Sequence, residues 1–139
     1  MIKLITFTDG GSRGNPGPAA CGAVIKSEIG EVLFQSSKYI GKATNNQAEY
    51  GALILALEKL LEIYKDENKN IDLKCYLDSE LVVKQLKKEY RMKNAGLKPL
   101  FYQVCDLILN FHSVKFFHIP REENKLADKL VNIELDKIR

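Results

Sequence analysis

The sequence predicts an α/β protein whose five-stranded mixed sheet carries helices on both faces. Apolar patterns near 2–8, 20–27 and 31–40 are separated by short turns, which indicates three strands in a meander. The first of these strands shows little polar alternation, as is typical of a central strand covered on both sides. Beyond residue 44, helical and strand patterns alternate. A chain of 139 residues suits one domain, and we expect residues 1–139 to form it.

Each later element is predicted from a local signal. Thr44 and Gln47 have the spacing of a capping box, which starts a helix. The polar run 65–70 reads as a loop after that helix. Pro99 suits the first turn of a helix that is apolar on most sides and should be largely buried. The elements after the meander are a helix near 44–64, a strand near 71–77, helices near 79–90 and 98–111, a strand near 114–119 and a helix near 122–137.

Asp9 is the first candidate for chemistry, because it follows the apolar strand 2–8 directly. A side chain at the end of a central strand is rigidly placed, which suits a metal ligand. The glycine-rich run 10–18 behind it predicts a tight turn, and glycine lets a backbone approach a bulky anion without Cβ clashes. For this segment taken alone, an ordinary turn that ends in aspartate is the alternative.

Three further carboxylates lie at comparable positions. Glu49 continues the apolar stripe of the helix near 44–64, where an unpaired charge is costly and needs a cation, a metal or a proton. Asp78 ends the strand near 71–77 and repeats the placement of Asp9. Asp128 lies at the edge of the apolar stripe of the last helix, where a solvated helix charge is the alternative.

Carboxylates placed in this way match the ligand set of hard divalent cations. Mg²⁺ prefers oxygen ligands in octahedral geometry and usually binds a few carboxylates together with substrate phosphate. Two such ions can activate a water on one side of a phosphorus atom and stabilise the leaving oxygen on the other. The sequence therefore predicts a site for phosphodiester cleavage, with metal ligands Asp9, Glu49, Asp78 and Asp128.

Four sequence blocks together resemble type 1 ribonuclease H, in its compact, archaeal-like branch. The blocks 8–19, 44–49, 77–79 and 118–128 occur in the family's order and span nearly the whole chain. The resemblance implies the ribonuclease H-like fold and an endoribonuclease that hydrolyses the RNA strand of RNA–DNA hybrids with two Mg²⁺ or Mn²⁺ ions. Attack by water with departure of the 3′-oxygen would leave 5′-phosphate and 3′-hydroxyl ends.

The same resemblance implies roles for individual residues. The family's catalytic, metal-binding carboxylates are matched by Asp9, Glu49, Asp78 and Asp128. Thr44 and Asn45 match a pocket for a phosphate of the DNA strand, and a helix N-terminus attracts phosphate. The groove in which 2′-hydroxyls distinguish RNA from DNA is matched by Asn15, Asn45 and the backbone of a turn at Gly10, Gly11 and Ser12.

His118 lies ten residues before Asp128, the spacing of the family's mobile catalytic histidine, which is proposed to shuttle protons or help release product. A structural role is the alternative, because the strand near 114–119 leads straight into Pro120. Two departures concern the substrate. Glu80 stands where better-known bacterial members have a glutamine in the RNA-contacting groove, and the short segment 89–99 stands where those members insert a tryptophan-rich basic helix and loop. A mostly basic stretch runs through 84–98. Its cations form either a reduced substrate handle or a solvated face.

Composition narrows the setting. A net charge of +3 is mild, so any nucleic-acid footprint must be local. The three cysteines form no C-x-x-C pattern and are odd in number, which predicts buried thiols in a reducing cytoplasm. No signal peptide precedes the first strand, and no apolar run approaches the roughly 20 residues that cross a bilayer. We therefore expect a cytoplasmic protein that binds no membrane. We also expect a monomer, and the resemblance implies that its ligand is an RNA–DNA hybrid.

Two other functions remain open from the sequence. One is a nucleic-acid-binding module that has lost catalysis, although a binder gains nothing from clustering negative charge beside phosphate. The other is a nuclease for DNA ends or single strands. Asn15, Thr44 and Asn45 argue against it, because the resemblance implies that they serve a hybrid groove.

Overall fold

Five strands form one mixed sheet in the computed structural model, which describes residues 1–138. The strands are β1 (Ile2–Ser12), β2 (Gly17–Ser27), β3 (Val32–Ala43), β4 (Ile71–Leu77) and β5 (Ser113–His118). Their spatial order is β3-β2-β1-β4-β5. The meander β1-β2-β3 is antiparallel, whereas β4 runs parallel to β1 and β5 parallel to β4. This arrangement confirms the predicted five-stranded mixed sheet.

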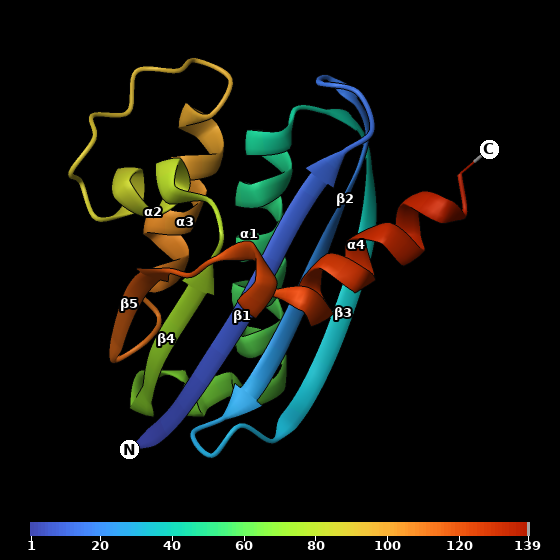
Figure 1. The fold of residues 1–139 in the computed structure, drawn as a ribbon. Helices are drawn as coiled ribbons and strands as arrows, with labels where there is room; N and C mark the ends of the chain where they lie inside the picture. The colour runs from blue at the N-terminus through green and yellow to red at the C-terminus, as the bar shows by residue number, and fades with distance from the viewer. Residues whose placement is uncertain (139) are drawn as a thin grey trace.

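Helices cover both faces of that sheet, as predicted. They are α1 (Asn45–Tyr64), α2 (Glu80–Leu86), α3 (Lys98–Ile108) and α4 (Lys125–Asp136). Helix α1 packs against β1 and β2, and α3 packs beside α1, whereas α4 crosses the other face over β2, β1 and β3 (Figure 1). Within residues 1–138 no helix is both long and apolar enough to span a bilayer.

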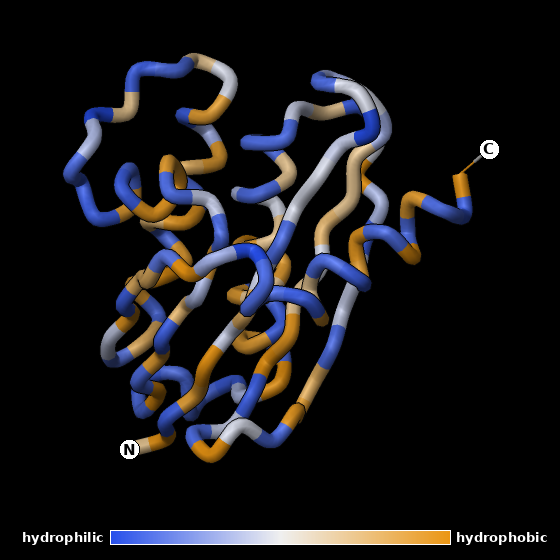
Figure 2. Tube along the Cα trace, viewed as in Figure 1, coloured by the Kyte–Doolittle hydropathy of each residue, from blue (hydrophilic) through white to orange (hydrophobic). Residues whose placement is uncertain are grey.

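The main core lies between the sheet and α1, with α2 and α3 at its side. Leu53 and Leu57 of α1 meet Leu73 of β4 there, together with Val82 and Val104 from the two shorter helices. The apolar colour in Figure 2 runs along the central strands, whereas the connection between α2 and α3 is mostly hydrophilic. A smaller apolar cluster of Ala20, Val131 and Leu135 holds α4 on its face of the sheet.

The course of β1 differs from the prediction. The strand does not stop before Asp9 but continues to Ser12, and its pairing with β2 extends to the register Ser12↔Ala19. The predicted turn at Gly10, Gly11 and Ser12 is therefore wrong, and the chain reverses at 13–16 instead. These glycines remain extended because β2 pairs with their backbone on one side.

Two other local predictions were also wrong, and one was confirmed. The polar run 65–70 is a 3₁₀ helix (Lys65–Asn70) rather than a loop. Within Lys98–Ile108 only Val104 is buried and Tyr102 is 58% exposed, because α3 packs against neighbours on one side only. The capping box at the start of α1 is present: the Gln47 main-chain N–H donates to Thr44 Oγ1 at 3.1 Å, and the Thr44 N–H donates to Gln47 Oε1 at 2.9 Å.

Candidate metal-binding active site

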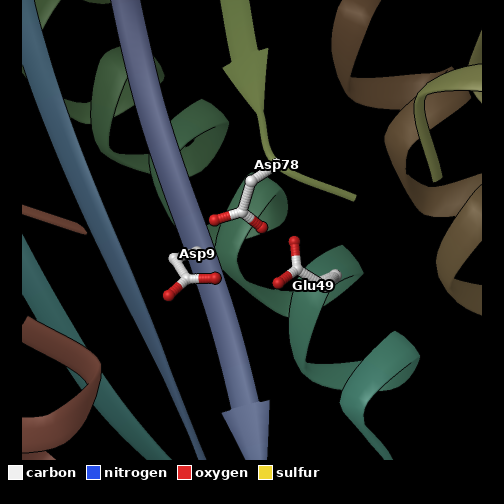
Figure 3. A group of neighbouring side chains, drawn as sticks. All are labelled: Asp9, Glu49 and Asp78. Carbon is white, nitrogen blue, oxygen red and sulfur yellow. The ribbon is translucent and has the colours of Figure 1, made fainter. Parts of the chain in front are cut away.

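Three carboxylates from three elements turn toward one another (Figure 3). Asp9 lies in β1, Glu49 in the early part of α1 and Asp78 directly after β4. One carboxylate oxygen of each lies within 4.8 Å of the others. Because β1 and β4 are parallel neighbours with Thr8 opposite Leu77, the two residues that follow, Asp9 and Asp78, emerge side by side. The arrangement offers converging oxygen ligands, which is what a hard divalent cation requires.

Glu49 has a buried carboxylate oxygen whose hydrogen-bonding capacity is not satisfied by the part of the chain that the structure describes. Its side chain is buried, and Oε1 accepts the main-chain N–H of Gly10 at 3.1 Å. Oε2 is also buried but has no hydrogen-bond partner within residues 1–138. A buried acceptor without a donor needs a cation or a proton, so the residues present fit a bound metal ion.

The electrostatics of the group point the same way. Burial is the main cause that raises the pKa of Asp9 from 3.8 to about 7, and the charge of Asp78 adds to it. Burial, followed by the charge of Asp9, raises the pKa of Glu49 as well. Both raised pKa values mean that a negative charge on these acids is unfavourable without a cation, and a bound cation would offset that cost.

Asp128, the fourth predicted carboxylate, lies at the border of the group. It is half-buried in the first turn of α4, and its Oδ1 is 3.9 Å from Nη2 of Arg121. It is not one of the three residues whose oxygens converge, but it contributes to the raised pKa of Asp9 after burial and Asp78. The structure thus brings three predicted ligands together and leaves the fourth beside them.

A cavity of about 350 Å³ opens over the carboxylates. Its walls combine the acidic group with amide side chains and one guanidinium. The lining residues are Asp9, Gly10, Asn45, Asn46, Glu49, Asp78, Ser79 and Arg121. Cations bound among the acids and the Arg121 side chain would together attract a phosphate-bearing ligand.

The predicted groove residues bond to one another beside this cavity. Asn45 Oδ1 accepts from the Ser12 main-chain N–H at 2.9 Å and from Ser12 Oγ at 3.1 Å. The Asn45 N–H donates in turn to Asn15 Oδ1 at 3.0 Å. These bonds tie the end of β1 and the following turn to the N-terminus of α1. Thr44 and Asn15 also line a second cavity of about 300 Å³ at that helix end.

Gly10 and Gly11 do not form the predicted tight turn. The Gly10 N–H is already bonded to Glu49, and a Cβ on Gly11 would make an ordinary contact of 3.7 Å with Val131. Neither glycine has a positive φ angle. Both glycines lie in a paired strand between α1 and α4, and not in a turn that approaches a bound anion.

His118 is not one of the residues whose ligand atoms converge with those of Asp9, Glu49 and Asp78. It is exposed at the end of β5, and within residues 1–138 it is not among those that line the 350 Å³ cavity. It instead lies close enough to Glu80 that, after the bond from Lys84, it helps lower the pKa of that carboxyl. Lys84 Nζ is 2.7 Å from Glu80 Oε1 and 3.3 Å from Tyr90 Oη. One cation of the basic segment 84–98, Lys84, is therefore paired with Glu80.

Sequence reasoning missed Asn124. Asn124 falls inside the helix predicted near 122–137, and no local pattern assigned it a role at the site. In the structure it is 1% exposed, and its side-chain amide donates to Asp78 Oδ2 at 3.1 Å.

Comparisons with known proteins agree with this geometry. A sequence profile of the family described as Reverse transcriptase-like matches residues 7–133. Ribonuclease HI of Halobacterium salinarum is 41% identical over 134 residues, which are 96% of this chain and 65% of that protein. A bifunctional protein of Mycobacterium tuberculosis is 38% identical over 136 residues, 97% of this chain but only 36% of the relative's length. The chain therefore spans less than two thirds of these curated relatives.

The fold is shared over whole chains in solved structures. An RNase H1 isolated from compost by a metagenomic approach superposes with a TM-score of 0.92 at 46% identity, covering 99% of this chain and 98% of that one. The same RNase H1 in complex with an RNA/DNA hybrid gives a TM-score of 0.92 at 45% identity, covering 96% and 97%.

Proposed function

The chain belongs to the ribonuclease H family, and from its site we propose that it is an endoribonuclease which hydrolyses the RNA strand of RNA–DNA hybrids. The observation that carries the proposal is the convergence of Asp9, Glu49 and Asp78, together with a buried oxygen of Glu49 that has no hydrogen-bond partner within residues 1–138. The hybrid complex of the related RNase H1 supports the choice of substrate.

Asp9, Glu49 and Asp78 would hold the metal, with Asp128 beside them as a further ligand. When bound, two Mg²⁺ or Mn²⁺ ions would supply the positive charge that lowers the pKa of an attacking water and stabilises the leaving 3′-oxygen. Water as nucleophile gives 5′-phosphate and 3′-hydroxyl products.

The chain's own residues orient both partners of the reaction. The Gly10 N–H holds one oxygen of Glu49 and leaves the other, buried oxygen available to a cation. Arg121 presents a guanidinium at the cavity wall, which suits a phosphate oxygen of the cleaved strand. Asn45 is held by Ser12 and Asn15, which supports a role for these three in lining the groove of the hybrid.

Thr44 and the N-terminus of α1 suit a phosphate of the DNA strand. The Thr44 Oγ1 atom accepts from the Gln47 N–H, which leaves its own hydroxyl hydrogen available to donate. The adjacent cavity of about 300 Å³ lies at a helix N-terminus, where main-chain N–H groups favour an anion.

We further propose that residues 1–139 work as a single domain, as a monomer, in a reducing cytoplasm and without a membrane. The free thiols of Cys21, Cys75 and Cys105 support the reducing compartment. We also propose a catalytic role for His118, on the basis of its spacing to Asp128. Its exposed position at the end of β5 would require the histidine to reach the substrate from outside the cavity.

The test is a cleavage assay on matched RNA–DNA, RNA–RNA and DNA–DNA duplexes with Mg²⁺, Mn²⁺ or a chelator. We expect cleavage of the RNA strand of the hybrid with either cation and none with chelator. Binding of the hybrid without cleavage would indicate an inactive binding module. Cleavage of DNA strands would instead indicate a deoxyribonuclease.

A further inference from the structure

Asn124 connects three parts of the candidate site through a buried side chain. It lies between the short 3₁₀ helix Arg121–Glu123 and α4, and it is 1% exposed. Its Nδ2 group donates to the main-chain carbonyl of Thr8 at 2.8 Å and to Asp78 Oδ2 at 3.1 Å. Its own carbonyl accepts the main-chain N–H of Asp128 at 3.1 Å. One residue thus contacts the segments that carry Asp9, Asp78 and Asp128.

The usual reason for an asparagine at this position does not apply. Asparagine before a helix normally accepts an N–H of the first turn through its side-chain oxygen. At the start of α4 no such side-chain cap is formed, and within residues 1–138 Oδ1 of Asn124 is buried without a partner. Both amide hydrogens are instead directed at β1 and at the Asp78 carboxylate.

The Asn124 side-chain amide can do what an isosteric carboxylate cannot, because it donates hydrogen bonds. A carboxylate can rotate about its side-chain torsion, and a hydrogen bond from a fixed amide limits that rotation to one orientation. Nδ2 can donate to Thr8 and Asp78 together because it carries two hydrogens. An aspartate of the same shape has no hydrogens to donate and would repel Asp78.

We infer that Asn124 is a positioning residue, which orients the Asp78 carboxylate for a divalent cation and fixes α4, with Asp128, to the end of β4 and to β1. The inference rests on the proposed function for the identity of the ligand, a divalent cation. Asn124 itself touches neither substrate nor reacting atoms, and it acts through Asp78. Loss of its amide should therefore weaken cation binding and slow catalysis without changing affinity for the hybrid.

A matched control exists within the chain. Asn68, in the 3₁₀ helix before β4, is also buried, its Nδ2 also donates to a main-chain carbonyl, that of Lys65, and its Oδ1 is likewise unpartnered. Asn68 lies before the N-terminal end of β4, whereas Asp78 follows its C-terminal end. Asn68→Ala therefore removes the same kind of buried amide away from the carboxylates.

The experiment compares Asn124→Ala with Asn68→Ala and wild type. Melting temperature is measured in chelator, the Kd of Mn²⁺ for metal-free protein by calorimetry, and kcat and KM on an RNA–DNA hybrid. We expect Asn124→Ala to weaken Mn²⁺ binding and to lower kcat by about tenfold or more each, with KM unchanged. Asn68→Ala should lower the melting temperature while Kd and kcat remain those of wild type.

Equal Mn²⁺ Kd values for the Asn124→Ala variant and wild type would overturn the inference, as would equal effects of the two alanine variants.

If Asn124→Ala does not fold, the inference is tested by NMR on the wild-type protein. The two Nδ2 proton signals of Asn124 should shift when Mg²⁺ is titrated into metal-free protein, whereas those of Asn68 should not. An unshifted Asn124 amide at Mg²⁺ saturation contradicts the role. Wild type that binds Mn²⁺ but cleaves no hybrid would instead refute the proposed function, and the Kd comparison would still test Asn124.

Discussion

A Cβ atom on Gly10 would lie 2.1 Å from the carbonyl oxygen of Ala48. At this point β1 and α1 approach each other so closely that only a glycine fits between them. The same approach allows the Gly10 N–H to reach Glu49 Oε1, so one close contact between strand and helix also sets the distance between Asp9 and Glu49.

The Gly10→Ala variant should be strongly destabilised. Overpacking of a tight interior typically costs about 1–3 kcal/mol, and we expect about 3 kcal/mol because the obstructing atoms belong to the α1 backbone. The free energy of unfolding is measured by urea denaturation. Gly11→Ala is the control, since its new methyl group would meet Val131 at an ordinary 3.7 Å. Equal stability of the two variants would show that the strand and helix are not so close.

The metal-free protein should lose stability as pH rises. The pKa of Asp9 is raised by burial, and further by Asp78, from 3.8 to about 7, so the folded state binds more protons than the unfolded state between those values. Stability in chelator therefore falls as pH increases across that window. Asp9→Asn should remove much of this slope and be at least as stable as wild type at pH 8, a condition chosen to lie above the window.

Urea denaturation in chelator at several pH values tests this expectation, together with Asp78→Asn, which also removes a repelling charge. Both variants should be inactive on hybrid. Exposed Asp106, in α3, supplies the control Asp106→Asn, which should keep the wild-type slope and activity. Destabilised Asp9→Asn and Asp78→Asn proteins that still cleave hybrid would identify these residues as structural caps.

Added Mg²⁺ should raise the melting temperature of the wild type. A cation that binds only the folded state stabilises it by about 2.7 kcal/mol at a free concentration of 100 times Kd. The gain should be larger above the raised pKa of Asp9 than below it, because below that pKa the cation must first displace a proton from the carboxyl group. Thermal melts with and without Mg²⁺ should show a smaller gain for Asp9→Asn and the full gain for Asp106→Asn.

Cations of the connection between α2 and α3 should contribute to hybrid binding. Lys87, Lys88 and Arg91 are exposed there, whereas Lys84 is paired with Glu80. Replacing the three exposed cations by glutamine should raise KM and flatten the log–log salt dependence of binding by about one per lost phosphate contact. A triple glutamine variant at the opposite end of the sheet, in Lys3, Lys65 and Lys69, should keep the wild-type slope. Identical slopes in both variants would assign the connection to a solvated face.

The cleaved RNA should carry 5′-phosphate and 3′-hydroxyl ends. Water as the nucleophile, with the 3′-oxygen as leaving group, requires this outcome. End-group analysis of a labelled RNA strand distinguishes it from a 2′,3′-cyclic phosphate. The cyclic product would mean that the RNA's own 2′-hydroxyl attacks, which is incompatible with the proposed hydrolysis.

Much of the architecture could be predicted from local patterns. Apolar periodicity located the strands and helices, and the capping box located the start of α1 within a residue, because these signals depend on neighbours close in the chain. The positions of Asp78 after β4 and of Glu49 on a buried helix face followed in the same way. The burial of α3 could not be predicted, because it depends on which elements pack around that helix.

The sequence by itself determined the order of the elements and which carboxylates sit where a metal site is possible. Only the tertiary structure decided what surrounds them. The bond from Gly10 to Glu49 joins residues 39 positions apart, and the bonds from Asn124 reach 46 and 116 positions along the chain. Such contacts depend on how β1, β4, α1 and α4 pack together, and periodicity within a single element carries no information about distances between elements. For that reason Gly10 was predicted as part of a turn and Asn124 only as a residue of the last helix, whereas the packing brings both to the carboxylates, through the bonds to Glu49 and Asp78.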